Sequence, residues 1–258
     1  MLIQLLTIHP LIVSGPLSES ILGRAQEQGV LDIRVVNIRD FALTKHQQTD
    51  DYPYGGGAGL VMKPEPVYGA VDWCKKRAAE GSKAPRVILM DPQGKVFNQK
   101  LAEELAREEH LILVCGRYEG FDERIRSLAT DEVSVGDYVL MGGELPALVM
   151  IEAVSRLIPG VLGDIESAVT ESHTSGLLEG PQYTRPIEFE GQRVPAILTS
   201  GDHGAVERWR RKEALKRTLE RRPDLLANLE MSHDDRVMLA ELKGEEPPPD
   251  PRKKRRRS

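Results

Sequence analysis

Cysteine is scarce in this chain, and its placement excludes several kinds of site. Only Cys74 and Cys115 occur among 258 residues, without a Cys-x-x-Cys pair. The six histidines are scattered and never form a His-Glu-x-x-His motif. We therefore expect a reducing compartment, no structural zinc and no metal site that can be recognised from the residues.

Long hydrophobic runs are also missing. The opening residues 1–8 are mostly apolar, but they are too few for a signal peptide or a membrane span and lack a basic flank. The sequence predicts a soluble, cytoplasmic protein without a membrane partner.

The common phosphate-binding loops are absent as well. There is no Gly-x-x-x-x-Gly-Lys-Ser/Thr, and no Gly-x-Gly-x-x-Gly opens a helix after the first strand. Instead, two glycine-rich segments each follow an apolar run: residues 113–120 (LVCGRYEG) and residues 136–146 (GDYVLMGGELP). Bare backbone at neighbouring strand ends predicts a nucleotide or nucleoside pocket for a ligand other than ATP or NAD.

Strand and helix patterns alternate along the first part of the chain. Short β-type runs at 2–8, 31–37, 86–90, 110–115 and 131–135 are separated by helical patterns at 17–29, 64–80, 98–108 and 121–129, and an apolar helix is expected at 144–158. This alternation predicts an α/β fold whose parallel sheet carries helices on both faces.

Changes in composition suggest four parts. We expect an α/β domain at 1–160, a linker at 161–180 where apolar periodicity is lost, and a small helical domain at 181–244. Within that domain, Ser232 and Asp235 form a capping-box pattern at the start of a helix. Residues 245–258 are rich in proline and basic side chains, which predicts a disordered tail.

Basic charge is concentrated although the chain is acidic overall. The formal net charge is −5, yet residues 208–222 carry eight basic and two acidic side chains on one predicted helix. Such a helix in an acidic protein indicates a contact with phosphates, while an ordinary solvated helix face stays possible. The loop 44–59 holds four glycines within five positions and is either a functional loop or a flexible connector.

Seven motifs, taken together, resemble the bacterial tRNA (guanine-N1)-methyltransferase family, TrmD. They are residues 51–57 (DYPYGGG) with Gly59, 92–94 (PQG), 115–120 (CGRYEG), 136–140 (GDYVL), 142–144 (GGE), 155–163 (SRLIPGVLG) and 183–186 (YTRP). The resemblance extends from the first strand to about residue 243. It implies a fold of the SPOUT class with a deep trefoil knot, a rare exception to the rule against knotted chains. It also implies a homodimer with shared active sites, S-adenosylmethionine as methyl donor, a requirement for Mg²⁺ without an identified ligand set, and the anticodon stem-loop of tRNA as partner.

The resemblance also assigns roles to residues. The implied adenosylmethionine pocket comprises Leu89, Met90, Pro92, Gly116, Tyr118, Gly120, Ser134, Val135, Gly136, Tyr138, Leu140, Gly142, Gly143 and Pro146. Contacts with tRNA are implied for Glu119, Asp50, Asp51, Gly57, Gly59, Arg208 and Trp209. Trp209 is equally compatible with a place in the core of the small domain.

The implied catalytic pair is Arg156 with a carboxylate that falls on Glu171, where the family has aspartate. Because glutamate is one methylene longer, a protein that binds adenosylmethionine and tRNA with weak or no turnover is one alternative. A methyltransferase that acts on a different RNA nucleoside is a second.

Overall fold

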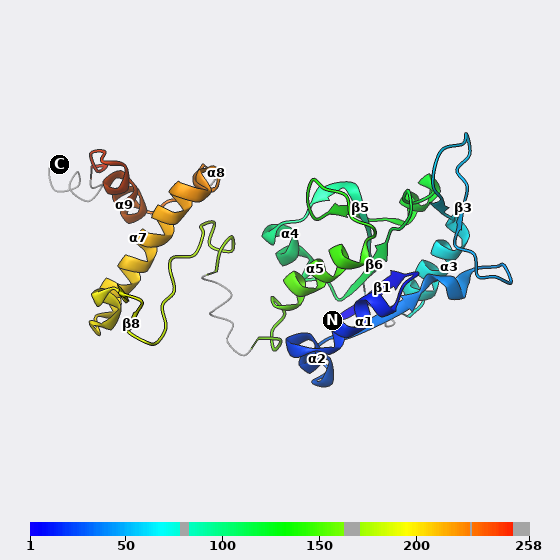
Figure 1. The fold of residues 1–258 in the computed structure, drawn as a ribbon, viewed down its shortest axis with the longest axis horizontal. Helices are drawn as coiled ribbons and strands as arrows, with labels where there is room; N and C mark the ends of the chain where they lie inside the picture. The colour runs from blue at the N-terminus through cyan, green and yellow to red at the C-terminus, as the bar shows by residue number, and fades with distance from the viewer. Residues whose placement is uncertain (78–82, 163–170, 228, 250–258) are drawn as a thin grey trace. The chain divides into compact units, whose positions relative to one another are not determined.

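The computed structural model describes residues 1–77, 83–162, 171–227 and 229–249. The chain divides into two compact units, Met1–Ile165 and Glu166–Ser258, and each is described by itself. Figure 1 traces both units from the N-terminus in blue to the C-terminus in red. The predicted linker lies partly, and the predicted tail largely, outside the described residues.

A five-stranded parallel sheet forms the centre of the first unit. Its strands are β1 (Leu2–Thr7), β2 (Asp32–Asn37), β5 (Arg86–Val96), β6 (His110–Cys115) and β7 (Asp131–Ser134), in the order β2-β1-β6-β5-β7. Every neighbouring pair is parallel, so the predicted α/β class with a parallel sheet is confirmed. β5, β6 and β7 are therefore neighbours, and their carboxyl ends meet at one edge of the sheet.

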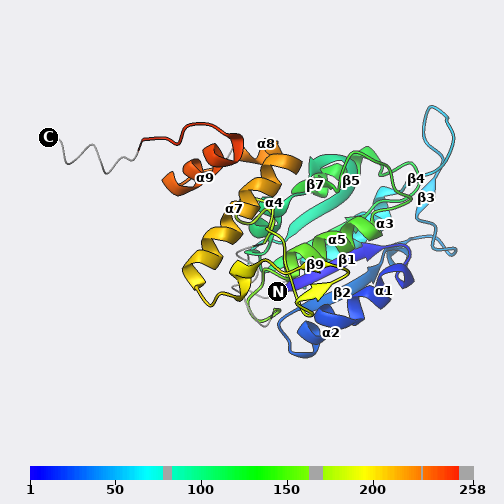
Figure 2. The same ribbon diagram turned by 60° about the vertical axis from the view of Figure 1, so that its left-hand side comes forward.

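Helices cover both faces because the strands are apolar on both sides. Leu111, Leu113 and Cys115 of β6 pack toward α1 (Leu11–Ser18), α2 (Ser20–Glu27), α4 (Gln99–Leu105) and α5 (Glu144–Ser155). The intervening Ile112 and Val114 pack toward α3 (Pro64–Lys75). Figure 2 shows the strands together with these helices.

Three local predictions need correction. The helix expected at 17–29 is two helices, because Glu19 is extended and Ser20 has a φ of 56° between α1 and α2. The helix expected at 121–129 is the shorter 3-10 helix η2 (Glu123–Leu128), capped by the Asp122 side chain. The strand expected at 86–90 continues to Val96, because a register shift between Met90 and Lys95 lets residues 91–94 bulge outward and the chain rejoin β7.

The remaining elements of the first unit are short. The 3-10 helix η1 (Ile38–Phe41) follows β2, and the glycine-rich loop is closed by the antiparallel pair β3 (Asp50–Asp51) and β4 (Val61–Met62). Met62 and Gly120 are joined by a backbone hydrogen bond of 2.9 Å. This bond ties the end of the loop to the turn after β6.

The second unit is built around one long helix, α7 (His203–Arg221). The other elements are β8 (Glu188–Phe189), β9 (Gln192–Arg193), η3 (Ala196–Thr199), α8 (Pro223–Leu226) and α9 (His233–Lys243). Leu177, Leu215 and Met238 form its small core. The capping box predicted from Ser232 and Asp235 is present at the start of α9 and is confirmed.

The segment that precedes β8 folds onto α7. The Leu178 amide donates to the Thr218 hydroxyl (2.9 Å), and Arg217 donates to the Glu179 carbonyl (3.0 Å). The Glu179 amide in turn donates to the Ser172 hydroxyl at 2.9 Å. The described chain from Ser172 to Glu179 is therefore held against the basic helix.

Candidate active-site cavity

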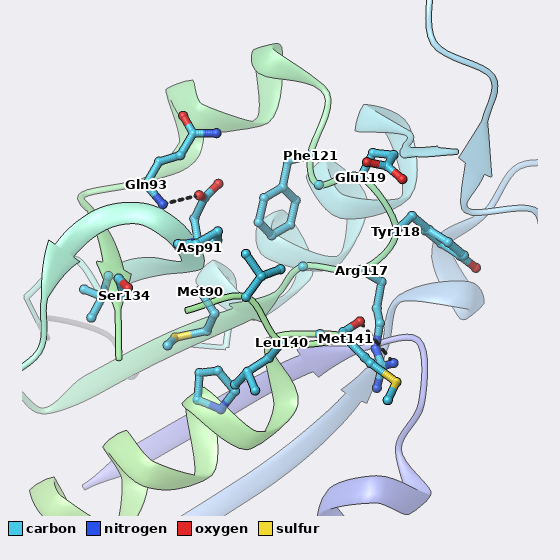
Figure 3. A pocket seen from close by; sticks show the side chains of 18 of the residues that line it. Met90, Asp91, Gln93, Arg117, Tyr118, Glu119, Phe121, Ser134, Leu140 and Met141 are labelled. Atoms are coloured by element: carbon cyan, nitrogen blue, oxygen red, sulfur yellow. Dashed lines mark hydrogen bonds between the residues drawn. The ribbon is translucent and has the colours of Figure 1, made fainter. Parts of the chain in front are cut away.

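A cavity of about 360 Å³ opens where β6 and β7 end, next to the bulge within β5. Its position follows from the strand order, since ligands of parallel α/β sheets bind beyond the carboxyl ends of the strands. Most of the lining comes from the bulge within β5, the turn after β6, and the segment between β7 and α5. The labelled side chains from these three segments surround the cavity in Figure 3.

The turn after β6 and the start of α5 are in direct backbone contact. The Gly143 amide donates to the Gly116 carbonyl at 2.9 Å. A β-carbon on Gly143 would lie 2.8 Å from the Cα of Cys115 and 2.8 Å from the Cβ of Met90. The φ of Gly143 is −81°, which other residues adopt easily. Glycine is therefore required here for space between two chain segments.

A buried ion pair fixes the same contact from the side chains. The Nε of Arg117 lies 2.9 Å and 3.1 Å from the two carboxylate oxygens of Glu144, and Thr7 donates to that carboxylate at 2.6 Å. The Arg117 guanidinium also donates to the Met141 carbonyl at 3.4 Å (Figure 3). Glu144 is 1% exposed. The Glu144 carboxylate and its partner Arg117 thus connect the end of β1, the turn after β6 and the loop before α5.

The bulge within β5 is held by a second buried carboxylate. Asp91 accepts from the Gln93 amide at 2.8 Å, drawn in Figure 3, and from Arg126 at 2.9 Å. A β-carbon on Gly94 would lie 2.3 Å from the backbone of Glu132 and Val133. The bulge is therefore pinned to β7 while its outer residues face the cavity.

The glycine-rich loop closes on the turn that carries Tyr118 and Glu119. The Glu119 amide donates to the Leu60 carbonyl at 3.0 Å, and a β-carbon on Gly59 would lie 2.4 Å from the Glu119 carboxylate. Burial, followed by the nearby Asp50 carboxylate, raises the pKa of Tyr118. Of the residues that the sequence assigned to tRNA contact, Glu119 lines the cavity, while Gly59 lies against Glu119 and Asp50 lies near Tyr118. Asp51 and Gly57 are exposed farther along the loop.

Most residues assigned to adenosylmethionine surround this one cavity. They are Met90, Pro92, Gly116, Tyr118, Gly120, Ser134, Val135, Tyr138, Leu140, Gly142, Gly143 and Pro146. The side chain of Leu89 is fully buried on the opposite face of β5, so a ligand could meet only its backbone. Gly136 is covered by the Tyr138 ring, which a β-carbon would approach to 2.6 Å.

Sequence reasoning missed the side chains that hold this cavity in shape. The lining residues without a predicted role are Asp91, Gln93, Arg117, Phe121, Glu123, Arg126, Val133, Val139 and Met141. Arg117 stood inside a recognised motif, and Asp91 directly follows an apolar strand, which is where polar site residues of α/β folds occur. The partners of these residues are distant in sequence, and no local pattern reveals them.

The two predicted catalytic residues belong to different units. Arg156 follows the last residue of α5, and Glu171 precedes the segment folded on α7. Both are half-buried and engaged in interactions. In the second unit, Arg208 is exposed on α7, whereas Trp209 is half-buried with its ring centroid 6.5 Å from that of Tyr183.

None of the described helices is both long and apolar enough to cross a membrane. Across the same parts of the chain, His, Cys, Asp and Glu form no group of three or more that could hold a metal ion.

Comparison with known proteins places the chain in a family. The family model described as tRNA (guanine-1)-methyltransferase TrmD matches residues 1–228. A relative from Symbiobacterium thermophilum named tRNA (guanine-N(1)-)-methyltransferase is 75% identical over 239 residues, covering 93% of this chain and 97% of its own. Relatives of the same name from Lactiplantibacillus plantarum and Dictyoglomus turgidum are 56% and 54% identical, covering 95% and 94% of this chain and 99% and 97% of theirs. These matches, which span both units, show that the chain belongs to the tRNA (guanine-1)-methyltransferase TrmD family.

Proposed function

We propose that this protein transfers a methyl group from S-adenosylmethionine to guanine N1 at position 37 of tRNA, in the reducing compartment that its cysteines predict. The observation that carries the proposal is the cavity between the bulge of β5 and the ends of β6 and β7, where the family motifs converge. The deep trefoil knot that the resemblance implies is part of the same proposal.

The chemistry of the cavity fits this methyl donor. Apolar side chains such as Met90, Leu140 and Pro146 provide a wall for the adenine ring, and the glycine turns leave backbone groups accessible to its polar edge. Among the lining carboxylates, Asp91 and Glu123 are paired with Arg126, and Glu119 would contribute a negative charge toward the positively charged sulfonium. The bound donor would supply an electrophilic methyl group.

Methylation of guanine N1 requires removal of a proton. At neutral pH this nitrogen carries hydrogen and becomes nucleophilic as the proton leaves, so a general base and a donor toward O6 are needed. We assign the base to Glu171 and the O6 contact to Arg156, whose guanidinium stays charged and can donate twice to a purine edge. Glu119 at the cavity wall would accept from the N1 and amino edge of the guanine.

A homodimer belongs to the proposal. Leu145 and Val149 lie one turn apart on α5 and are both more than half exposed, although other residues of that helix are buried. Val139 and Met141, in the loop before α5, are exposed as well. An apolar surface of this kind suits a subunit interface. Light scattering of the purified protein should give twice the mass of one chain.

Mg²⁺ is expected from the resemblance, and the described residues form no group of three or more His, Cys, Asp or Glu that identifies its ligands. We therefore assign no chemical step to this ion. It is included in the assay as a component of the buffer.

The direct test is transfer of labelled methyl from S-adenosylmethionine to two tRNA transcripts that differ only in guanosine or adenosine at position 37. Label should enter the guanosine transcript alone. Label in both transcripts would instead indicate a methyltransferase for another nucleoside. Absence of label with intact adenosylmethionine binding would favour the binding-protein reading.

Variants at Glu171 test the base. Glu171→Gln should remove methyl transfer while adenosylmethionine affinity is unchanged, because the amide keeps the shape and cannot accept the proton. Glu171→Asp should change the rate little if glutamate is a working base. A large gain from near-zero activity would mean that the natural glutamate is misplaced.

A further inference from the structure

The basic side chains of α7 fall into two groups. Arg211 pairs with Asp235 at 2.8 Å, Lys212 pairs with Glu241 at 2.8 Å, and Arg217 donates to the Glu179 carbonyl at 3.0 Å. These contacts hold α9 and the preceding segment against α7. The cations in this group serve the internal structure of the unit, so the predicted phosphate contact must come from others.

Arg210 belongs to the second group and faces a cavity inside the same unit. The cavity has a volume of about 400 Å³, within the range of roughly 300–1,000 Å³ typical of small-ligand pockets. Its lining consists of Pro181, Gln182, Tyr183, Thr184, Arg185, Ile187, Val194, Leu198, Thr199 and Arg210.

The charge of this cavity is one-sided. Arg185 and Arg210 line it without any acidic residue, although the chain as a whole has a net charge of −5. Among the described residues, neither guanidinium is within ion-pair distance of a carboxylate. By contrast, two arginines near them in sequence are paired, Arg193 with Glu188 and Arg211 with Asp235. Two cations left without a counter-ion at a cavity favour an anionic ligand such as a phosphate group.

The rest of the lining suits a nucleobase. The Tyr183 side chain is 48% exposed, and its ring is inclined at 48° to the half-buried Trp209 ring behind it. Ile187 and Leu198 add apolar surface, while Gln182 and Thr199 supply groups that can bond to a base edge or a ribose. Unpaired RNA bases are bound by aromatic stacking combined with backbone contacts from arginine.

We infer that this cavity binds one unpaired nucleotide of the tRNA substrate, with its phosphate at Arg185 and Arg210 and its base against Tyr183. The inference rests on the proposed function, because it adds a subsite for the same substrate. It differs from the contact assigned from sequence, which placed the substrate on Arg208 and Trp209.

The test compares two arginines on one helix. Arg210→Ala removes a cavity cation, and Arg221→Ala removes an exposed cation of α7 that lies outside the cavity lining. Affinity for an anticodon stem-loop RNA is measured by fluorescence anisotropy at several salt concentrations. We expect about a tenfold loss and a salt slope lower by about one for Arg210→Ala, and less than about a twofold loss for Arg221→Ala.

The aromatic part is tested separately. Tyr183→Ala should weaken RNA binding about tenfold, and Tyr183→Phe should keep most of the affinity, since the ring supplies the stacking. The chain has two tryptophans, so Trp73→Phe leaves Trp209 as the fluorescent reporter next to Tyr183. Titration with the RNA should quench the Trp209 fluorescence. With Arg210→Ala added, the same quenching should require a higher RNA concentration.

Three results would overturn the inference. Equal losses for Arg210→Ala and Arg221→Ala would show that α7 acts only through its overall charge. If Arg210→Ala leaves RNA affinity unchanged but alters the oligomeric mass or the unfolding midpoint, the cavity would be a site of protein contact and not of RNA binding. Failure of the wild-type protein to bind RNA would remove both this inference and the proposed function.

The inference and the proposed function can also fail separately. Methyl transfer to guanosine, with equal RNA affinities for Arg210→Ala and Arg221→Ala, would remove the subsite alone. RNA binding that depends on Arg210 and Tyr183, without any methyl transfer, would remove the proposed function alone.

Discussion

Arg117 and Glu144 are 27 residues apart in sequence and form a bidentate ion pair between the turn after β6 and the first turn of α5. The carboxylate is 1% exposed and the arginine side chain 17%. Glu144 also accepts from Thr7 at the end of β1 and lies at the amino end of a helix, where a negative charge is favourable. The cavity that we assign to adenosylmethionine is shaped around this pair.

Removal of one partner should destabilise the fold because the other charge stays buried. We expect Glu144→Gln to lower the free energy of unfolding by about 3 kcal/mol, and Arg117→Ala by a similar amount. The double variant should lose much less free energy of unfolding than the sum of the two single losses. Urea unfolding of the two single variants and the double variant measures these changes. Arg124→Ala, which breaks an exposed pair with Asp122, is the control and should cost less than about 1 kcal/mol. Additive losses at Arg117 and Glu144 would show that the pair is not coupled.

Gly143→Ala should damage ligand binding through space alone. The new β-carbon would lie 2.8 Å from the Cα of Cys115, so the turn after β6 and the start of α5 must separate. We expect adenosylmethionine affinity, measured by calorimetry, to fall at least tenfold. Gly15→Ala in α1 is the matched control, since no atom lies within 4 Å of its β-carbon position. Wild-type affinity in Gly143→Ala would contradict the packing described here.

Stability should fall as the pH drops below about 6.5, the ordinary pKa of histidine. Burial, followed by the nearby Arg34 charge, lowers the pKa of His110 in the folded protein. Its Nε2 lies 2.7 Å from the Gln4 side-chain oxygen, and its Nδ1 has no hydrogen-bond partner among the described residues. As the pH falls, the unfolded chain therefore binds a proton before the folded one does.

Urea unfolding between pH 7.5 and pH 5 measures this effect. The free energy of unfolding should be highest at the upper end and decline toward pH 5. A His110→Asn variant should show a shallower decline over the same window, whatever its absolute stability. Parallel curves for the two proteins would exclude His110 as the source.

Asp235→Ala should destabilise the second unit by about 2–3 kcal/mol. This carboxylate accepts from Arg211 and closes the capping box with Ser232, and it is 5% exposed. Asp234 lies beside it in the same first turn and is exposed, so Asp234→Ala should cost less than about 1 kcal/mol. Hydrogen exchange of α9 amides distinguishes the two variants. Equal protection in both would contradict the role of Asp235.

The sheet could be predicted from the sequence because each strand is a short apolar run between polar turns. Residues 110–115 are buried at every position, and this pattern is visible without a structure. The break between α1 and α2 was not visible, because it depends on the backbone at Glu19 and Ser20 and not on hydrophobic spacing. The bulge at 91–94 was missed because it is set by hydrogen bonds to Arg126 and by contact with β7.

The cavity lining was predicted where glycine and apolar motifs end at neighbouring strands. Gly116 and Gly143 could be placed in this way, yet their contact with each other depends on two segments 27 residues apart. Glu144 reads in the sequence as an ordinary residue at the start of a helix, and only the fold reveals its buried partner Arg117. The basic helix was recognised, but its division into paired and unpaired cations requires knowledge of α9.

The attachment of residues 172–179 to α7 has a consequence for how chemistry and recognition are coupled. Ser172, which follows the proposed base, accepts from Glu179, and Arg217 of α7 holds that same residue by its carbonyl. Glu171 is therefore anchored next to the helix that we expect to meet RNA. Because the proposed base is carried by the unit that we expect to meet RNA, substrate selection would act on the rate of methyl transfer as well as on affinity.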